Sequence, residues 1–271
     1  MNLNEIAACL KGSEVAPLQI IREIGSSTVA LFAVFNDKNG NRLELAGTGT
    51  LISVGQSHFI LTAAHVWHKA LKSAVKVGIS ITDDINHRFL MDVKTIVPCG
   101  PAKTNGWDEW GPDIIFLRIP TEHLETIKAY KSLYDPKIDG NRAVKTDRID
   151  RIEVDVLMGT PHALGKFTKT HADVQIAGFF TLGAARYHTR GGFDYFDCVI
   201  DNSYPEIRKS FGGVSGGGLW AVRLYSSPTS GTIEWIRTLE GVAFYQLPDD
   251  NGRPSIRCHG PEAIRAAMPA K

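Results

Sequence analysis

The sequence lacks long apolar runs and an excess of charge of one sign, and each absence excludes a class of function. No apolar stretch approaches the ~20 residues that a helix needs to cross a bilayer, so we expect no membrane partner. Lys and Arg together number 30 and Asp and Glu together number 29. This balance offers no electrostatic basis for binding nucleic acid or an anionic lipid surface.

Cysteine is also scarce. The four cysteines, Cys9, Cys99, Cys198 and Cys258, are dispersed, without a Cys-x-x-Cys pair or the spacing of a metal site. The chain also opens without the succession of basic, apolar and small residues that marks a signal peptide. We therefore expect reduced thiols in a cytoplasmic protein.

Glycine, by contrast, is concentrated in one stretch. Residues 211–220 read Phe-Gly-Gly-Val-Ser-Gly-Gly-Gly-Leu-Trp, which places Ser215 among five glycines and ahead of the apolar run Leu219–Val222. Glycine tolerates positive φ angles and lets other groups approach the backbone. A serine on such a turn is a candidate nucleophile, with neighbouring N–H groups able to face a developing oxyanion. Because serine is a weak nucleophile at neutral pH, it needs a base and a group that orients the base.

Two upstream stretches supply those partners. The apolar run Phe59–Thr62 is followed by two alanines and then His65, so we expect the imidazole at a strand end, on a tight turn. Asp113 opens another apolar run, Ile114–Leu117, where a carboxylate is drawn below the surface and can hold a histidine in one tautomer. Asp108 in the preceding loop is the rival acid, but no apolar run follows it.

The three stretches resemble, in order, the signature blocks of trypsin-like (chymotrypsin-fold) serine proteases. They are Thr62–His65, Asp113–Leu117 and Gly213–Gly217. The chain departs from the family at Val214, where many members have an aspartate, and at Gly218, where a proline is frequent. The whole is most similar in character to bacterial, intracellular, stand-alone members of the family.

The resemblance implies an all-β fold of two six-stranded β-barrels, with short N-terminal and C-terminal helices and the active site in the cleft between the barrels. Many short strand-like runs separated by turn signals agree with it. We expect an N-terminal helical extension at 1–17, a first barrel at 18–130, a linker at 131–150 and a second barrel at 151–271. His65 and Asp113 would then come from the first barrel and Ser215 from the second.

Local patterns predict the remaining elements. A helical pattern near the N-terminus is closed by Gly12 and Pro17. Further helices are expected at 66–71, 121–130 and 260–268, with Thr121 as the N-cap of the second, and separate strands at 233–239 and 241–247.

The resemblance also implies a mechanism. Ser215 attacks the scissile carbonyl, His65 passes the proton to the leaving amine, and Asp113 orients the imidazole. The N–H groups of Gly213 and Ser215 form the oxyanion hole. The expected reaction is peptide-bond cleavage through an acyl-enzyme, with a protein or peptide partner and no metal or organic cofactor. Because some relatives lie beside effectors that they cleave, a co-encoded effector or regulator is a further candidate partner.

Six residues are expected to bind the substrate, also by resemblance. A cation at the base of the primary specificity pocket would disfavour Arg or Lys before the cleaved bond and favour an acidic or small polar residue. An extended substrate would pair with a strand at the pocket wall, where Gln246 would narrow the entrance. The residues are Lys209 and Ser210 at the pocket base and Ala243, Phe244, Tyr245 and Gln246 in the strand.

Several alternatives stand beside this interpretation. Gly213–Gly217 also fits the Gly-x-Ser-x-Gly turn of α/β-hydrolases, with Asp249, Asp250 and His259 downstream. Three glycines after the serine disfavour the helix which that fold requires. A phosphate-binding loop would need a Lys-Ser or Lys-Thr that is missing here. The rival in function is a catalytically silent domain of the same fold that binds proteins. The histidines other than His65 are interpreted as ordinary polar residues.

Overall fold

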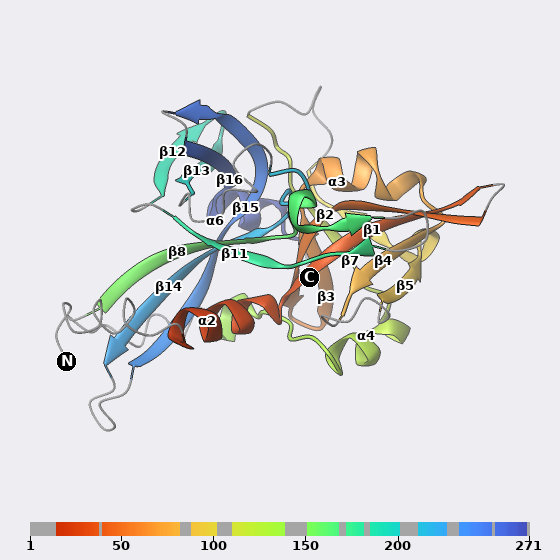
Figure 1. Ribbon diagram of the computed structural model, residues 1–271, viewed down its shortest axis with the longest axis horizontal. Helices are drawn as coiled ribbons and strands as arrows, with labels where there is room; N and C mark the ends of the chain where they lie inside the picture. Colours follow the sequence, from red (N-terminus) through yellow and green to blue (C-terminus); the bar gives the residue numbers. More distant parts are fainter. Residues whose placement is uncertain are drawn as a thin grey trace.

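The computed structural model describes residues 15–37, 40–81, 88–101, 110–138, 151–167, 172–181, 185–200, 211–226, 233–250 and 253–269. Within these ranges the chain forms two antiparallel seven-stranded sheets, one from each half of the sequence, with short helices around them (Figure 1). The predicted all-β architecture of two barrel-like halves is confirmed, with seven described strands in each of the two large sheets where six were expected.

The first sheet holds the strands around the predicted histidine and aspartate. Its order is β5-β4-β1-β2-β3-β7-β6, so β3 lies between β2 and β7. The strands are β1 (Thr28–Asp37), β2 (Gly40–Val54), β3 (Ser57–Thr62), β4 (Lys76–Ser80), β5 (Arg88–Asp92), β6 (Val97–Cys99) and β7 (Ile115–Arg118).

The second sheet begins after the described part of the chain resumes at residue 151, and its order is β11-β8-β14-β15-β16-β13-β12. Its strands are β8 (Arg151–Gly159), β11 (Ala177–Phe180), β12 (Arg186–Arg190), β13 (Phe193–Val199), β14 (Gly218–Ser226), β15 (Ile233–Asp250) and β16 (Arg253–His259). A further pair, β9 (Lys166–Phe167) and β10 (Ala172–Asp173), stands apart.

β15 is one strand where the sequence predicted two. Gly241 is paired with Leu219 and Leu239 with Trp220, so Glu240 is the extra residue of a β-bulge. A bulge bends a strand without ending it. The glycine that was interpreted as a break is therefore accommodated inside a single strand.

Each described α-helix lies directly before or after a strand. The α-helices are α2 (Val15–Gly25), α3 (Ala64–Lys69), α4 (Thr121–Lys128) and α6 (Pro261–Ala267), with 3₁₀ turns η1 (Leu71–Ser73), η2 (Val93–Thr95) and η3 (His162–Leu164).

Two predictions about the helices are wrong. Pro17 lies in the first turn of α2 instead of closing a helix, because a proline there removes only an N–H that has no partner in the helix. The N-cap of α4 is Pro120, and Thr121 is the first helical residue. The helical pattern predicted before residue 15 lies outside the described residues.

Apolar packing joins the two halves. One core cluster contains Phe59 and Phe116 from the first sheet together with Trp220 and Val242 from the second, all of them buried. Tyr134 packs edge-to-face on Trp220, with ring centroids 5.0 Å apart. Burial of such side chains stabilises a contact by about 1.5–3 kcal/mol each. The seam between the halves is thus a packed core, and groups at its edge are held in place. Within the described ranges, no helix combines the length and apolar character needed to cross a membrane.

Candidate active site

His65 and Asp113 meet at the ends of two paired strands. β3 pairs with β7, with Thr62 opposite Ile115, so the residues just after β3 and just before β7 are neighbours. His65 lies in the first turn of α3, and its side chain is 20% exposed, whereas that of Asp113 is 2% exposed. Their imidazole and carboxylate therefore meet at the edge of the buried seam.

Two hydrogen bonds join the pair. The main-chain N–H of His65 donates to Asp113 Oδ1 at 2.7 Å, and His65 Nδ1 lies 2.6 Å from Asp113 Oδ2. Because an ionised carboxylate only accepts hydrogen bonds, Nδ1 carries the proton in this arrangement. The neutral imidazole then has its lone pair on Nε2, the tautomer that a general base requires.

Ser215 lies on a tight turn that glycine makes possible. Gly213 and Gly216 have φ angles of +89° and +88°. A Cβ on Gly213 would lie 2.3 Å from the carbonyl oxygen of Thr160, and one on Gly216 would lie 2.1 Å from that of Thr48. Both positions therefore require glycine for conformation and for space.

The turn is held between strands of both halves. The N–H of Gly216 donates to the carbonyl of Ala243 on β15 at 2.7 Å, and the N–H of Thr48 on β2 donates to the carbonyl of Ser215 at 2.8 Å. A Cβ on Gly47 would lie 2.8 Å both from the Ser215 carbonyl oxygen and from Val66 Cγ2. The serine's backbone and the residue after His65 thus pack against the same glycine, which brings the three predicted residues to one region.

Thr48 is a residue of this region that the sequence analysis missed. Its buried hydroxyl donates to the carbonyl of Gly213 at 2.7 Å and accepts from the N–H of Thr160 at 2.9 Å. Its carbonyl accepts from the hydroxyl of Thr62 at 2.7 Å. A threonine in a Gly-Thr-Gly stretch carries no local sign of these contacts, because their partners come from distant parts of the chain.

A cavity of about 200 Å³ adjoins Ser215. Its wall contains Ala243, Phe244, Tyr245 and Gln246 of β15, which are four of the six predicted substrate-binding residues. Gln246 also ties β15 to the segment before the serine, because its Oε1 accepts from the N–H of Phe211 at 3.0 Å. The remaining lining residues are Phe211, Gly212, Val214 and Ile256. Lys209, Ser210 and the rival acid Asp108 lie outside the described residues.

The loop that carries Asp113 is anchored to the second half through Trp110. The hydroxyl of Tyr195 donates to the carbonyl of Trp110 at 2.9 Å. The guanidinium groups of Arg257 and Arg190 lie 3.8 and 4.2 Å from the centroid of the indole ring. Arg257 also makes two hydrogen bonds to Asp197, at 2.7 and 2.9 Å. Burial acts to raise the pKa of Asp197, but Arg257, with help from His188, outweighs it and leaves that pKa below its usual value.

His259 was interpreted as an ordinary polar residue, and the structure corrects this. It ends β16, is fully buried, and its Nε2 accepts the main-chain N–H of Asp113 at 2.9 Å. Burial lowers the pKa of its imidazole to about 4, although the nearby charges of Asp113 and Asp194 act to raise it. The imidazole is therefore neutral at pH 7 and belongs to the surroundings of the His65–Asp113 pair.

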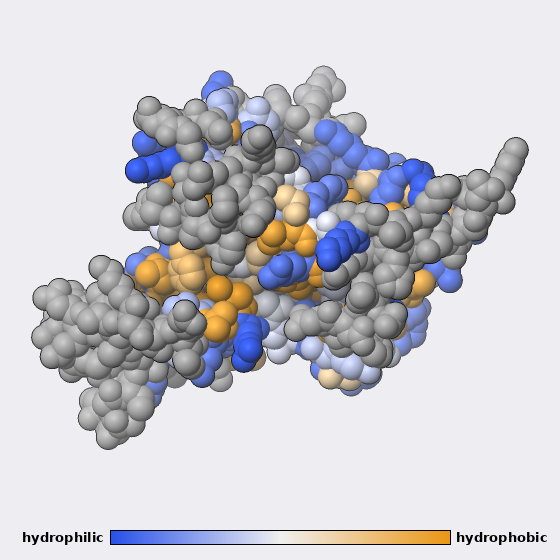
Figure 2. Space-filling view, in the orientation of Figure 1, coloured by the Kyte–Doolittle hydropathy of each residue, from blue (hydrophilic) through white to orange (hydrophobic). Residues whose placement is uncertain are grey.

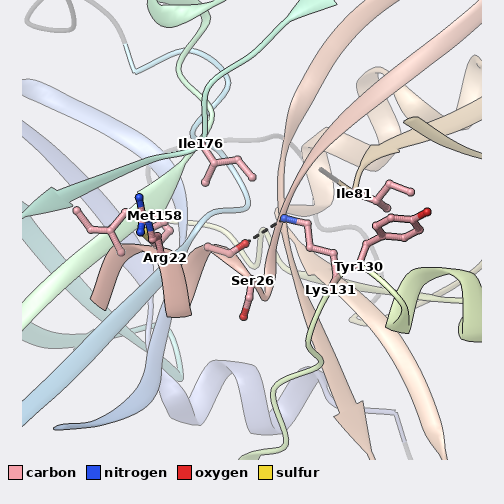
Figure 3. Close-up of a pocket in the computed structure, with 9 residues that line it drawn as sticks. Arg22, Ser26, Ile81, Tyr130, Lys131, Met158 and Ile176 are labelled. Atoms are coloured by element: carbon pink, nitrogen blue, oxygen red, sulfur yellow. Dashed lines mark hydrogen bonds between the residues drawn. The ribbon is translucent and has the colours of Figure 1, made fainter. Parts of the chain in front are cut away.

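A second cavity, of about 390 Å³, lies beside α2 and contains none of the predicted site residues (Figure 3). Figure 2 shows apolar side chains gathered on this face, where α2 lies against β8 and β11. At the cavity edge Lys131 Nζ donates to the carbonyls of Gly25 and Thr28, at 3.1 and 3.0 Å. A cation that binds the last carbonyls of a helix stabilises its C-terminus, so we assign this lysine a structural role.

The part of the chain that the structure describes contains no candidate metal site and no disulfide bond. No group of three or more His, Cys, Asp or Glu residues in that part is arranged to hold a metal ion. Cys99, Cys198 and Cys258 are free thiols.

Comparisons with known proteins show a likeness in structure alone. No protein-family model matches the sequence, and no curated protein sequence matches it. Among solved structures, tobacco vein mottling virus protease is 10% identical with a TM-score of 0.40, over 89% of this chain and 79% of that one. Catalytically inactive tobacco etch virus protease complexed with substrate is 11% identical with a TM-score of 0.40, over 91% and 86%.

A third similar structure concerns the coupled folding and binding of the Sesbania mosaic virus VPg protein. It is 12% identical with a TM-score of 0.44, over 88% of this chain and 87% of that one. Identities this low and TM-scores below 0.5 do not carry residue roles or substrates over to this chain.

Proposed function

We propose that the protein is a serine endopeptidase of the trypsin-like type, which cleaves peptide bonds through a His-Asp-Ser triad and an acyl-enzyme intermediate. The observation that carries the proposal is the His65–Asp113 pair, joined at 2.6 Å and lying beside the glycine turn of Ser215. A buried carboxylate that fixes the tautomer of a partly exposed imidazole is the arrangement that activates a serine hydroxyl.

In this mechanism Ser215 Oγ attacks the scissile carbonyl carbon while His65 Nε2 takes the hydroxyl proton. The C–N bond of the tetrahedral intermediate breaks as the same nitrogen returns the proton to the leaving amine. Water then repeats the sequence on the acyl-enzyme and releases the carboxylic acid. Asp113 stays ionised throughout, holds the imidazole in one orientation and stabilises the imidazolium.

The backbone of the turn supports an oxyanion hole at Gly213 and Ser215. In the described part of the chain, the N–H groups of Val214, Gly216 and Gly217 already donate to main-chain carbonyls. That leaves the N–H groups of Gly213 and Ser215 for the developing oxyanion. Fixed donors of this kind contribute about 10²–10³-fold to turnover each.

The substrate is an extended peptide that adds to the edge of β15. β14 begins at Gly218, opposite Val242, and the N–H and carbonyl of Ala243 bind Gly217 and Gly216, so within the described residues β15 continues beyond these neighbours from Phe244 onward. An exposed strand edge offers main-chain groups to a peptide. No acidic side chain is among the described residues that line the cavity beside Ser215. An arginine or lysine before the cleaved bond would enter it without a partner, so we propose that basic side chains are disfavoured at this position.

Covalent labelling with a fluorophosphonate probe tests the proposal. The full chain should be labelled at one site, which peptide mapping assigns to Ser215, and Ser215→Ala should abolish labelling while leaving the circular dichroism spectrum unchanged. Absence of labelling in a folded wild-type chain would reject the enzyme and favour a silent, protein-binding domain.

Three further parts of the interpretation stay predictions from the sequence. They are a cytoplasmic, bacterial setting, a co-encoded effector or regulator as partner, and a cation from Lys209 at the base of the specificity pocket. A peptide-library cleavage profile of the wild type and of Lys209→Ala decides the last. An acidic preference that is lost in the variant would establish the cationic base.

A further inference from the structure

We propose that His259 is a positioning residue of the active site. Its neutral imidazole accepts the main-chain N–H of Asp113 and packs against the wall of the substrate cavity. The inference rests on the proposed function in one respect, that the His65–Asp113 pair is catalytic. The contacts themselves belong to the fold.

The hydrogen bonds of Asp113 reach both halves of the molecule. Its two carboxylate oxygens bind the N–H and the Nδ1 of His65, so the side chain makes its contacts within the first half. Its main-chain N–H donates instead to His259 Nε2 on β16 of the second half, at 2.9 Å. Both donor and acceptor are buried. The orienting acid is therefore held from both halves, and the second contact fixes the backbone that carries the carboxylate.

The contact with Asp113 fixes the protonation state of His259. A main-chain N–H can only donate, so Nε2 must be unprotonated, and in a neutral ring the proton lies on Nδ1. That nitrogen is buried without a hydrogen-bond partner among the described residues. A buried polar group without a partner costs stability, so retaining one here points to a requirement that the acceptor at Nε2 meets.

Aromatic side chains surround the imidazole ring of His259. It stacks on Phe244, with centroids 4.2 Å apart and an interplanar angle of 18°. Phe244 itself lines the cavity beside Ser215. Tyr195 packs on the ring at 5.2 Å, and Tyr195 also holds the carbonyl of Trp110 in the loop before Asp113. The imidazole thus lies between the cavity wall and the aspartate, in contact with both.

The contact between the Asp113 N–H and His259 Nε2 depends on a glycine at position 111. A Cβ on Gly111 would lie 2.9 Å from His259 Nε2 and 2.5 Å from the amide nitrogen of Asp113. Any larger residue would separate the donor from the acceptor. Gly111 opens the run Gly-Pro-Asp at 111–113, so the loop is shaped to admit the imidazole.

Two substitutions separate the acceptor from the packing. His259→Phe keeps an aromatic ring against Phe244 but has no acceptor, and His259→Gln supplies a carbonyl oxygen that can accept the N–H of Asp113. Phe193→Leu is the matched control, since Phe193 packs edge-to-face on His259 with centroids 6.1 Å apart and supplies no acceptor for the N–H of Asp113. Should His259→Phe not fold, His259→Leu replaces it.

The kinetic readout uses a p-nitrophenyl ester and the fluorophosphonate probe on the full chain, at a temperature where circular dichroism shows each variant folded. His259→Phe should lower kcat by about 10²-fold with KM within a few-fold, because a small misplacement of a catalytic group costs about that factor. His259→Gln should stay within about tenfold of the wild type, and Phe193→Leu within about twofold. A wild-type kcat in folded His259→Phe, or equal losses in His259→Phe and His259→Gln, would overturn the proposal.

A second readout does not depend on activity. Nitrogen-15 NMR should show His259 with Nδ1 protonated and Nε2 unprotonated, and the reverse tautomer would overturn the proposal. The downfield proton of the His65 Nδ1–Asp113 bond should be lost or shifted in His259→Phe and kept in His259→Gln; an unchanged resonance in both would also overturn it. A wild type that is not labelled at Ser215 rejects the proposed peptidase alone, and these spectra then decide the role of His259.

Discussion

The main-chain N–H of Thr48 donates to the carbonyl oxygen of Ser215 at 2.8 Å, so a strand of the first half holds the turn that carries the serine. The hydroxyl of the same threonine binds the carbonyl of Gly213. Since Thr48 lies on β2, which pairs with β3, the strand that leads into the helix of His65, one residue links the serine turn to the strand before the histidine.

Thr48→Val removes the hydroxyl and leaves the carbonyl of Gly213 and the N–H of Thr160 without their buried partner. We expect a loss of about 1–3 kcal/mol in the free energy of unfolding and a slower reaction of Ser215 with fluorophosphonate. Urea denaturation and labelling rates measure the two effects. Thr50→Val is the control, because the buried hydroxyl of Thr50 has no partner among the described residues and its loss should cost little. Equal losses in the two variants would contradict the role given to Thr48.

Gly216→Ala should disrupt the serine turn. The φ angle is +88°, and the new Cβ would lie 2.0 Å from Thr62 Oγ1 and 2.1 Å from the carbonyl oxygen of Thr48. Relief of this overlap must move the turn away from β2, so labelling of Ser215 should be lost. Gly55→Ala is the control: its φ angle is +63° with no atom within 4 Å of a Cβ, and it should cost only about 1–2 kcal/mol of strain. Thermal unfolding and labelling of both variants provide the comparison.

Asp113→Asn should lower kcat on the order of 10⁴-fold, since an amide in place of the carboxylate favours the wrong tautomer of His65. Asp108→Asn should have a far smaller effect. Ester hydrolysis at saturating substrate measures both. A reversal of the two effects would assign the orienting role to Asp108.

The chain of 271 residues should be active without cleavage near its N-terminus. Trypsin-like zymogens use an aspartate before the serine to receive a new N-terminus, whereas Val214 is apolar, 1% exposed and packed in a core cluster with Phe211. Labelling of Ser215 before and after removal of the first 14 residues checks this; labelling that requires the removal would contradict it. Val214→Asp should also destabilise the fold by about 3–5 kcal/mol, because it would bury an unpaired charge.

Stability should fall in mild acid because of His259. Its pKa of about 4 lies below the unfolded value of about 6.5, so between these pH values the unfolded chain binds the proton and the folded chain does not. The contribution is complete above about pH 6.5 and is lost as the pH falls toward 4, for a total of about 3 kcal/mol. Urea denaturation between pH 7 and 4 should show a shallower decline in His259→Gln than in the wild type. Parallel declines would show that His259 titrates normally in the folded state.

The elements that the sequence predicted well are those with local causes. Short apolar runs between turn residues indicated the all-β fold, and the helix before the C-terminus begins at Pro261, close to the predicted start. The error at α2 has a cause that is only partly local. Pro17 is compatible with a first helical turn, and the burial of Ile20 and Ile24 at 1% exposure continues the helix beyond it. That burial depends on strands far along the chain, which periodicity alone does not reveal.

By itself, the sequence determined the order and chemical identity of the candidate triad. His65 follows small residues at a strand end, Asp113 precedes an apolar strand, and Ser215 lies in a glycine turn, and each of these settings is local. Only the tertiary structure decided which groups hold them. Thr48 lies 167 positions before Ser215 (215 − 48) and His259 lies 146 positions after Asp113, and both bind through hydrogen bonds between main chain and distant residues. Such bonds need only a donor and an acceptor at the right distance, so they leave no motif, and they exist only once the two sheets have packed against each other.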